Sequence, residues 1–225
     1  MSVRSRISGF FTAASAVIYG LAAVLFLCVL IHTAWSDLRH VWLYYFFSSG
    51  AAAVFLLMLL PRFRHNLRWW MKFTHELTHT LVALLFFRKI STFVVREKEC
   101  YVAYSGGWFG YVPITLSPYC VPLYTLMILP FRYAANIEFM QIFDFLLGFT
   151  YMFHIMSFCV QFNFRQSDII NCGKVRSTFF IAFMQFFFAS LVIETIRGGV
   201  WNALKRVVCT YPAEILASLY SSLPF

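Results

Sequence analysis

Long apolar stretches separated by short polar segments run along almost the whole chain. Six of these stretches are long enough to cross about 30 Å of hydrocarbon as helices, and they cover residues 10–31, 41–60, 69–87, 111–129, 139–164 and 177–193. The first exceeds the apolar core of about 7–15 residues in a cleaved signal peptide, so we expect it to be retained. The sequence therefore predicts an all-α polytopic membrane protein with about six transmembrane helices.

The segment between the third and fourth apolar stretches has a different pattern. Residues 90–95 and 100–104 are rich in β-branched and aromatic side chains, and residues 96–99 form a polar turn between them. This pattern predicts a small β-hairpin directly after the third span.

The fourth apolar stretch contains three prolines, Pro113, Pro118 and Pro122. Proline removes a helical hydrogen bond, so we expect this span to be kinked or partly unwound. Such a break is tolerated in a membrane only where the freed backbone is buried in protein or lines a cavity. Residues 116–122 are therefore candidates to line a cavity, with a merely kinked packing helix as the alternative.

The composition excludes an ordinary soluble domain. Hydrophobic residues make up 61% of the 225 residues and charged residues only 12%, whereas a soluble domain carries about 25% charge. The net charge of +9 does not indicate nucleic acid as a partner, because the basic residues flank apolar stretches, where they set orientation and contact lipid. The six cysteines lack C-x-x-C spacing, so neither a disulfide framework nor a cysteine metal site is predicted. We expect one integral membrane domain, residues 1–225, in contact with the lipid bilayer.

Basic residues at the ends of the apolar stretches predict the orientation of the chain. Six spans place both termini on one side, which the positive-inside rule assigns to the cytoplasm. The basic groups on that side would be Arg4, Arg6, Arg132 and the clusters at residues 62–72 and 197–206. Residues 197–225 mix apolar and basic side chains, which favours a helix lying on the bilayer surface. We expect a multi-pass protein of the cytoplasmic membrane of a bacterium.

The sequence His75-Glu76-Leu77-Thr78-His79 lies within the third apolar stretch. Positions i and i+4 of a helix share one face, so His75 and His79 can present two imidazoles to one metal ion. Glu76 lies about 100° around the helix, where its carboxylate can reach a metal-bound water instead of the metal. Ionisable groups in a membrane span are costly, so this cluster is a candidate functional site. The competing interpretation is an exposed helical turn with two solvated histidines.

A catalytic zinc ion typically has three protein ligands and one open position for water. The candidates for the third ligand in or beside the later spans are Asp144, His154 and Asp168. Depth in the membrane favours His154, because it lies well inside the fifth span, as His79 does in the third. Asp168 follows the end of the fifth span, so its loop would have to fold back toward the metal. Asp144 is the weakest of the three candidates.

Residues 75–83, His-Glu-Leu-Thr-His-Thr-Leu-Val-Ala, resemble the first motif of the site-2 protease family of intramembrane zinc metalloproteases. The hairpin after the motif helix and the Pro-containing span are also similar to that family's core, so the resemblance covers about residues 69–173. In that family the third ligand is an Asp at the end of a later span, within an Asn-x-x-Pro…Leu-Asp-Gly signature. This chain lacks the Asp-Gly pair and the matching Pro, and its nearest equivalent is residues 148–154 followed by Gln166-Ser167-Asp168 and Gly173. The resemblance therefore implies Asp168 as the third ligand, with His154 as the alternative.

The resemblance implies a zinc-dependent intramembrane endopeptidase that hydrolyses peptide bonds in or near the transmembrane segments of a membrane protein substrate. Zn²⁺ would be the cofactor and Glu76 the general base, and a regulatory membrane subunit is compatible with this function. Two alternatives remain: a non-catalytic scaffold, chaperone or transporter subunit with a structural metal site, and a membrane metallopeptidase of another lineage, such as those that process prenylated proteins. The intact Glu76 favours an enzyme, because a metal site without turnover needs no general base.

The predicted hairpin also has a functional interpretation. A protease must hold its substrate extended, and an exposed strand edge does this by taking the substrate as an additional strand. We expect the edge at residues 93–95 to have this role, with an ordinary hairpin outside the membrane as the alternative.

Overall fold

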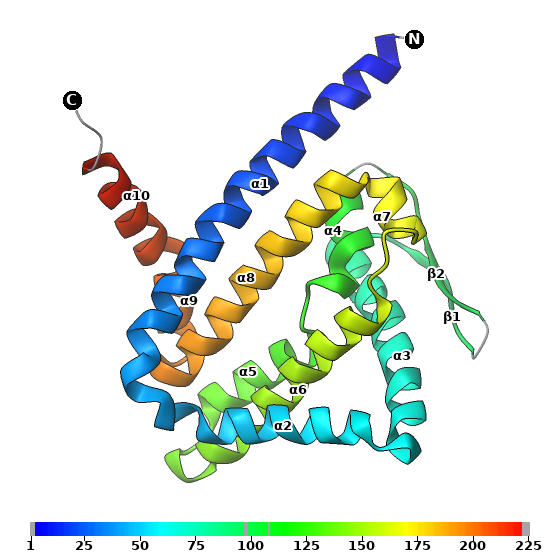
Figure 1. The fold of residues 1–225 in the computed structure, drawn as a ribbon. Coiled ribbons are helices and arrows are strands. Elements are labelled where there is room, and N and C mark those ends of the chain that lie inside the picture. Colours follow the sequence, from blue (N-terminus) through cyan, green and yellow to red (C-terminus); the bar gives the residue numbers. More distant parts are fainter. Residues whose placement is uncertain (1–2, 97–98, 108, 222–225) are drawn as a thin grey trace. The chain divides into compact units, whose positions relative to one another are not determined.

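The computed structural model describes residues 3–96, 99–107 and 109–221. In these residues the chain is mainly helical, with one two-stranded antiparallel sheet (Figure 1). The chain forms two compact units. One combines the chain up to Tyr45 with the chain from Gly173 onward, and the other comprises Phe46–Cys172.

The first unit consists of α1 (Val3–Asp37), η1 (Leu38–Tyr44), α8 (Lys174–Gly198), α9 (Val200–Lys205), the π-helical turn η4 (Arg206–Thr210) and α10 (Tyr211–Ser221). Its two long helices, α1 and α8, run side by side (Figure 1). Edge-to-face aromatic pairs join them, Tyr19 with Phe180 and Phe26 with Phe183. This arrangement brings the positive edge of one ring to the negative face of the other. The many Phe residues of α8 therefore serve in part as packing surface.

The C-terminal tail packs on α1 and α8 of this unit. Val207 and Tyr211 are buried in one cluster with Val29 of α1. The fully buried carboxylate of Glu194 accepts hydrogen bonds from Arg206 and from the Tyr211 hydroxyl, both at 2.9 Å. Burial and this hydrogen bond raise the pKa of Tyr211 to about 12. Because a buried carboxylate requires such partners, Glu194 ties the tail to α8.

The second unit consists of α2 (Tyr45–Leu59), α3 (Pro61–Leu85), β1 (Ile90–Val95), β2 (Cys100–Tyr104), α4 (Tyr111–Leu116), η2 (Ser117–Tyr119), α5 (Leu123–Ala134), η3 (Ile137–Phe139), α6 (Met140–Gln161) and α7 (Ser167–Cys172). The predicted hairpin is confirmed, since β1 and β2 pair antiparallel with Phe93 opposite Val102. Helix α3 contacts both strands and η2, and α5 contacts α6. The unit therefore surrounds the C-terminal half of α3 with elements that follow it in sequence.

The fourth apolar stretch is broken, as its prolines predict. Tyr111–Tyr119 and Leu123–Ala134 meet at an angle of 84°. Pro118 has no N–H, so the Ile114 carbonyl four residues earlier cannot accept the usual helical hydrogen bond. The Ser117 hydroxyl donates to this carbonyl instead, at 2.9 Å, and the same oxygen is available to other donors.

The number of helices with the length and composition to cross a membrane is smaller than the six expected spans. Within the described residues, four helices are long and apolar enough to cross a membrane, namely Gly9–Ser36, His40–Leu59, Ile137–Gln161 and Lys174–Gly198. The bent pair raises this number to five if it counts as one span. Helix α3 begins at Pro61, earlier than the expected start at residue 69. It is not among the four, because even its C-terminal part, residues 68–85, carries Arg68, Lys72 and Glu76 as well as the two histidines. The helix that carries the His-Glu-His motif is thus more polar than predicted.

Arg132 has a different environment from the one predicted. We expected it among the basic residues that face water, but its side chain is only 5% exposed. Its Nε donates a hydrogen bond to Asp144 Oδ1 at 2.6 Å, which joins α5 to α6. Leaving either partner of a buried ion pair alone is strongly destabilising, so this pair has a structural role.

Candidate metal centre

Helix α3 presents the two histidines of the motif on one face, one turn apart. The ring centroids of His75 and His79 are 5.0 Å apart. The Nδ1 atom of His79 lies 2.9 Å from the Ile114 carbonyl oxygen, the carbonyl that Pro118 leaves without a helical donor. This contact favours the tautomer in which Nδ1 carries the proton and donates it, leaving Nε2 as the ligand atom. The proline break therefore orients one of the candidate ligands.

Asp168 reaches the histidines because the chain turns back after α6. Helix α6 ends at Gln161, and Asn163 organises the turn: its carbonyl accepts from the Gln166 N–H at 3.0 Å, and its side chain accepts from the Arg165 N–H at 2.9 Å. Helix α7 then starts at Ser167 and carries Asp168 in its first turn. The loop thus folds back toward the motif, as the interpretation of Asp168 as a ligand required.

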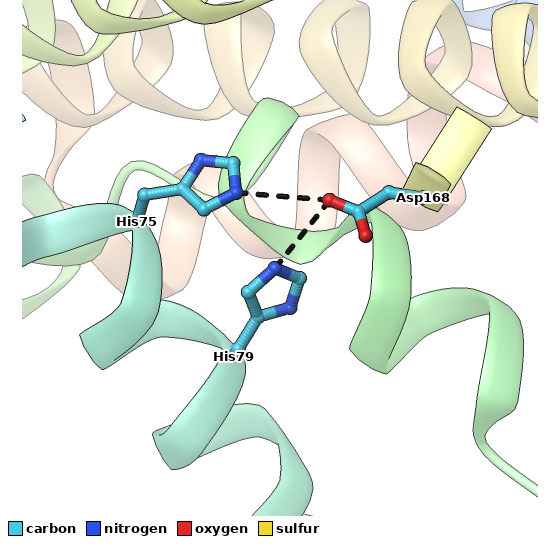
Figure 2. Close-up of side chains that lie close together, drawn as sticks. All are labelled: His75, His79 and Asp168. Carbon is cyan, nitrogen blue, oxygen red and sulfur yellow. Dashed lines mark ion pairs between the residues drawn. The ribbon is translucent and has the colours of Figure 1, made fainter. Parts of the chain in front are cut away.

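Figure 2 shows the three side chains converging from α3 and α7. Asp168 Oδ2 lies 3.7 Å from Nε2 of His75 and 3.7 Å from Nε2 of His79. One ligand atom from each residue lies within 4.8 Å of the other two. Atoms bound to one tetrahedral zinc ion at about 2.0–2.2 Å lie about 3.4 Å apart, so small movements bring this set to ligand geometry. Two imidazoles and a carboxylate are also a donor set that suits zinc.

The charge state of Asp168 suits a metal ligand. Burial raises the pKa of its carboxyl, but the contacts with His75 and His79 outweigh burial and hold the pKa well below its ordinary value. The ionised carboxylate is the form that binds a cation.

Glu76 lines the same cavity as the three candidate ligands. The cavity has a volume of about 420 Å³, and its walls come from α3, β2, α4, η2 and α7. The Glu76 side chain is 7% exposed and is not one of the three residues whose ligand atoms cluster. A general base that takes a proton from a metal-bound water has to lie beside the metal ligands without being one of them, and Glu76 has this position.

A second and larger cavity adjoins this one. Its volume is about 930 Å³, and it shares His75, Glu76, Cys100 and Gln166 with the first. Other parts of its wall come from the basic N-terminal half of α3 and from the end of α6. The site therefore has space for a polypeptide segment beside the candidate ligands.

The structure places the two alternative third ligands elsewhere. His154 is buried on α6 and lines a small cavity with His75, Thr150 and Ser157, and Asp168 is not part of the wall of this cavity. Asp144 pairs with Arg132. Among the described residues, the structure brings Asp168 next to the two histidines and does not bring His154 or Asp144 into that group.

Sequence reasoning did not connect Tyr119 or Gln166 with the metal ligands, although both line the cavity. The signal for Tyr119 was its place between Pro118 and Pro122, in the segment that we expected to line a cavity. For Gln166 the sequence held no comparable signal, because its position depends on the turn after α6.

Comparisons with protein-family models, with curated proteins and with solved structures give no match to this chain. A functional conclusion therefore rests on the chemistry and geometry of these side chains.

Proposed function

We propose that this protein is a membrane-embedded, zinc-dependent endopeptidase that cleaves peptide bonds in or near the transmembrane segments of another membrane protein. The observation that supports this most directly is the group of His75, His79 and Asp168 with Glu76 in one cavity. Its motif, its hairpin and its broken span also resemble the site-2 protease family, which supports the same reaction class. A regulatory membrane subunit and a bacterial cytoplasmic membrane remain part of this proposal.

The chemistry follows from the roles of these residues. The side chains of His75, His79 and Asp168 would hold the ion, and a zinc ion there would polarise the scissile carbonyl and acidify a bound water. Glu76 accepts the proton of the attacking water and returns it to the leaving amine. The buried position of Glu76 keeps bulk water from competing for that proton.

The apolar helices support the membrane part of the proposal. Four helices, or five with the bent pair, have the length and composition to cross a bilayer. We propose that these helices span the membrane and that α3 is shielded by the elements it contacts, namely β1, β2, α4, η2 and α6. Such shielding would allow a helix with ionisable side chains to lie near the bilayer.

Zinc content tests the proposal directly. The protein purified in detergent is expected to contain about one zinc per chain, because three protein ligands and one water complete the usual catalytic site. Stripping the metal with a chelator should abolish cleavage of a transmembrane substrate, and adding zinc back should restore it. A protein that folds, binds no zinc and cleaves at the same rate with and without chelator would contradict the proposal.

The substrate must enter this site in an extended form. An intact helix uses every backbone amide in its own hydrogen bonds, so the segment around the scissile bond has to unwind first. The cavity is lined by Cys100, Tyr101, Val102 and Tyr104 of β2. We therefore expect the substrate to pair with β2. The edge that we expected from the sequence, residues 93–95, belongs to the other strand of the hairpin, β1.

The hydrogen-bond pattern identifies which N–H groups of the hairpin face outward. Opposed residues of an antiparallel pair alternate between pairs that exchange hydrogen bonds and pairs that do not. At the turn the Arg96 N–H donates to the Glu99 carbonyl at 2.8 Å. Arg96 and Glu99 are therefore a hydrogen-bonded pair, and the alternation makes Phe93 and Val102, three positions further along the register, a pair without mutual hydrogen bonds. Their N–H groups therefore point to the two opposite free edges.

Proline at these two positions separates the edges. Val102→Pro should slow cleavage about tenfold or more, because it removes an outward donor on the strand that lines the cavity. Phe93→Pro makes the same change on the other edge and is the matched control, so it should retain most of the activity. Cleavage rates of one substrate by the two variants, with zinc content measured in parallel, check this expectation. Equal rates in both variants would exclude strand addition at β2 and leave the zinc site untouched.

A further inference from the structure

Tyr119 lies at the break in the fourth apolar stretch, with its side chain only 1% exposed. It is the last residue of η2, and the backbone there is held by hydrogen bonds from Cys120 and Val121 to the Ser117 carbonyl, at 3.1 and 2.8 Å. Pro118 and Pro122 on either side restrict the backbone further. The side chain is therefore fixed at a rigid point of the chain.

Tyr119 contacts two of the three candidate ligands. Its ring packs edge-to-face on His75, with centroids 5.2 Å apart. Its hydroxyl donates a hydrogen bond to Asp168 Oδ2 at 3.1 Å. This oxygen is also the Asp168 atom that lies nearest to both histidine Nε2 atoms. One side chain therefore touches the ligand atom of Asp168 and the ring of His75.

Gln166 completes a short hydrogen-bond chain. Its side-chain amide is also in hydrogen-bond contact with the Tyr119 hydroxyl. A phenol can accept one hydrogen bond while it donates another. The amide oxygen of Gln166 is the atom beside the Tyr119 hydroxyl, but a hydroxyl has one proton and cannot donate to both Gln166 and Asp168. Rotating the amide by 180° places its nitrogen there, so that Gln166 donates to Tyr119 and Tyr119 donates to Asp168.

Asp168 needs such support from outside its own element. It lies on α7, which has only six residues, and a helix this short has little stability of its own. Metal-binding side chains are commonly held by an outer shell of hydrogen bonds that fixes their orientation. His79 already has such a partner in Ile114, three residues before Ser117 in the same broken segment. The broken segment thus contacts all three candidate ligands.

We propose that Tyr119 is a positioning residue of the metal centre: its hydroxyl fixes the ligand oxygen of Asp168 while its ring fixes His75. This inference rests on the proposed zinc site. It gives the break in this span a role, since a continuous helix would supply neither an Ile114 carbonyl without a helical donor nor this placement of Tyr119.

Tyr119→Phe tests the role of the hydroxyl, because it retains the ring on His75 and removes only the donor to Asp168. The zinc affinity, measured by chelator competition, is expected to fall about 10–100-fold, and the visible spectrum of the Co²⁺-substituted protein should change. The thermal unfolding temperature of the metal-free protein should remain close to that of the unchanged chain. The matched control is Tyr124→Phe, whose hydroxyl bonds to Thr74 at 3.1 Å and which should leave affinity and spectrum unchanged.

Two further variants show whether Tyr119 acts through Asp168. In an Asp168→Ala background, Tyr119→Phe should have no additional effect on metal affinity, because contacting residues are coupled. Gln166→Leu should also weaken zinc binding, by a smaller factor than Tyr119→Phe. This variant provides a second test if Tyr119→Phe does not fold. Unchanged affinity in both Tyr119→Phe and Gln166→Leu would overturn the inference, as would a full effect in the Asp168→Ala background. An unchanged chain that binds no zinc would instead overturn the proposed function.

Discussion

Glu76→Gln is expected to retain zinc and to lose cleavage activity by about 10²–10⁴-fold. Glutamine has nearly the same shape as glutamate but cannot accept the proton of the attacking water, and general-base catalysis typically contributes a factor of this size. Zinc should remain because Glu76 is not among the three residues whose ligand atoms cluster. The measurements are the rate of cleavage of a transmembrane substrate and the zinc content of the same preparation.

A matched control distinguishes this role from a general effect of charge. Glu99 lines the adjoining cavity at the end of the hairpin turn, so Glu99→Gln removes one negative charge near the site without touching the proposed base. Its cleavage rate should remain within a few-fold of the unchanged protein. Full activity of Glu76→Gln would refute the proposed mechanism. A variant that folds without zinc would place Glu76 among the ligands instead.

Asp168→Ala is expected to weaken zinc binding far more than His154→Ala does. Loss of a ligand should lower the affinity by more than the roughly 10–100-fold that follows from loss of an outer-shell group. The geometry supports this order, because Asp168 Oδ2 lies 3.7 Å from both imidazole Nε2 atoms, whereas His154 lines another cavity. Zinc affinity measured by chelator competition compares the two variants.

Unfolding measurements make this comparison interpretable, because His154 is buried and its removal leaves a cavity. Both variants should therefore be compared at a temperature where each is folded. Normal zinc affinity in Asp168→Ala together with loss of zinc in His154→Ala would show that depth in the membrane was the better guide to the third ligand.

Local features of the structure could be predicted from neighbouring residues. The spacing of His75 and His79 places both on one face of any helix, whatever surrounds it. The β-branched and aromatic residues at 90–95 and 100–104 flank a polar turn, and both strands form there. Proline removes a backbone donor in every context, so the break after Tyr119 was also predictable.

The number of apolar helices was harder to predict because it depends on where each helix begins. The third apolar stretch begins at residue 69, within the basic cluster at residues 62–72, so we expected most of that cluster to lie outside the span. In the structure Leu60 ends one helical segment in an extended conformation and Pro61 starts α3, as proline favours at a first helical position. The basic cluster is therefore part of the motif helix, which is too polar to count with the other spans.

The sequence by itself determined the residues that can do the chemistry, the hairpin and the proline break, because each depends on contacts within a few residues. Only the tertiary structure decided which distant side chain joins His75 and His79. Depth in the membrane favoured His154, because it lies inside the fifth span as His79 lies inside the third, whereas the family resemblance favoured Asp168. The turn at Asn163 reverses the chain and returns Asp168 to the motif, while α6 holds His154 in a separate cavity. Such a reversal depends on hydrogen bonds and packing between segments, and a linear pattern of apolar residues contains neither.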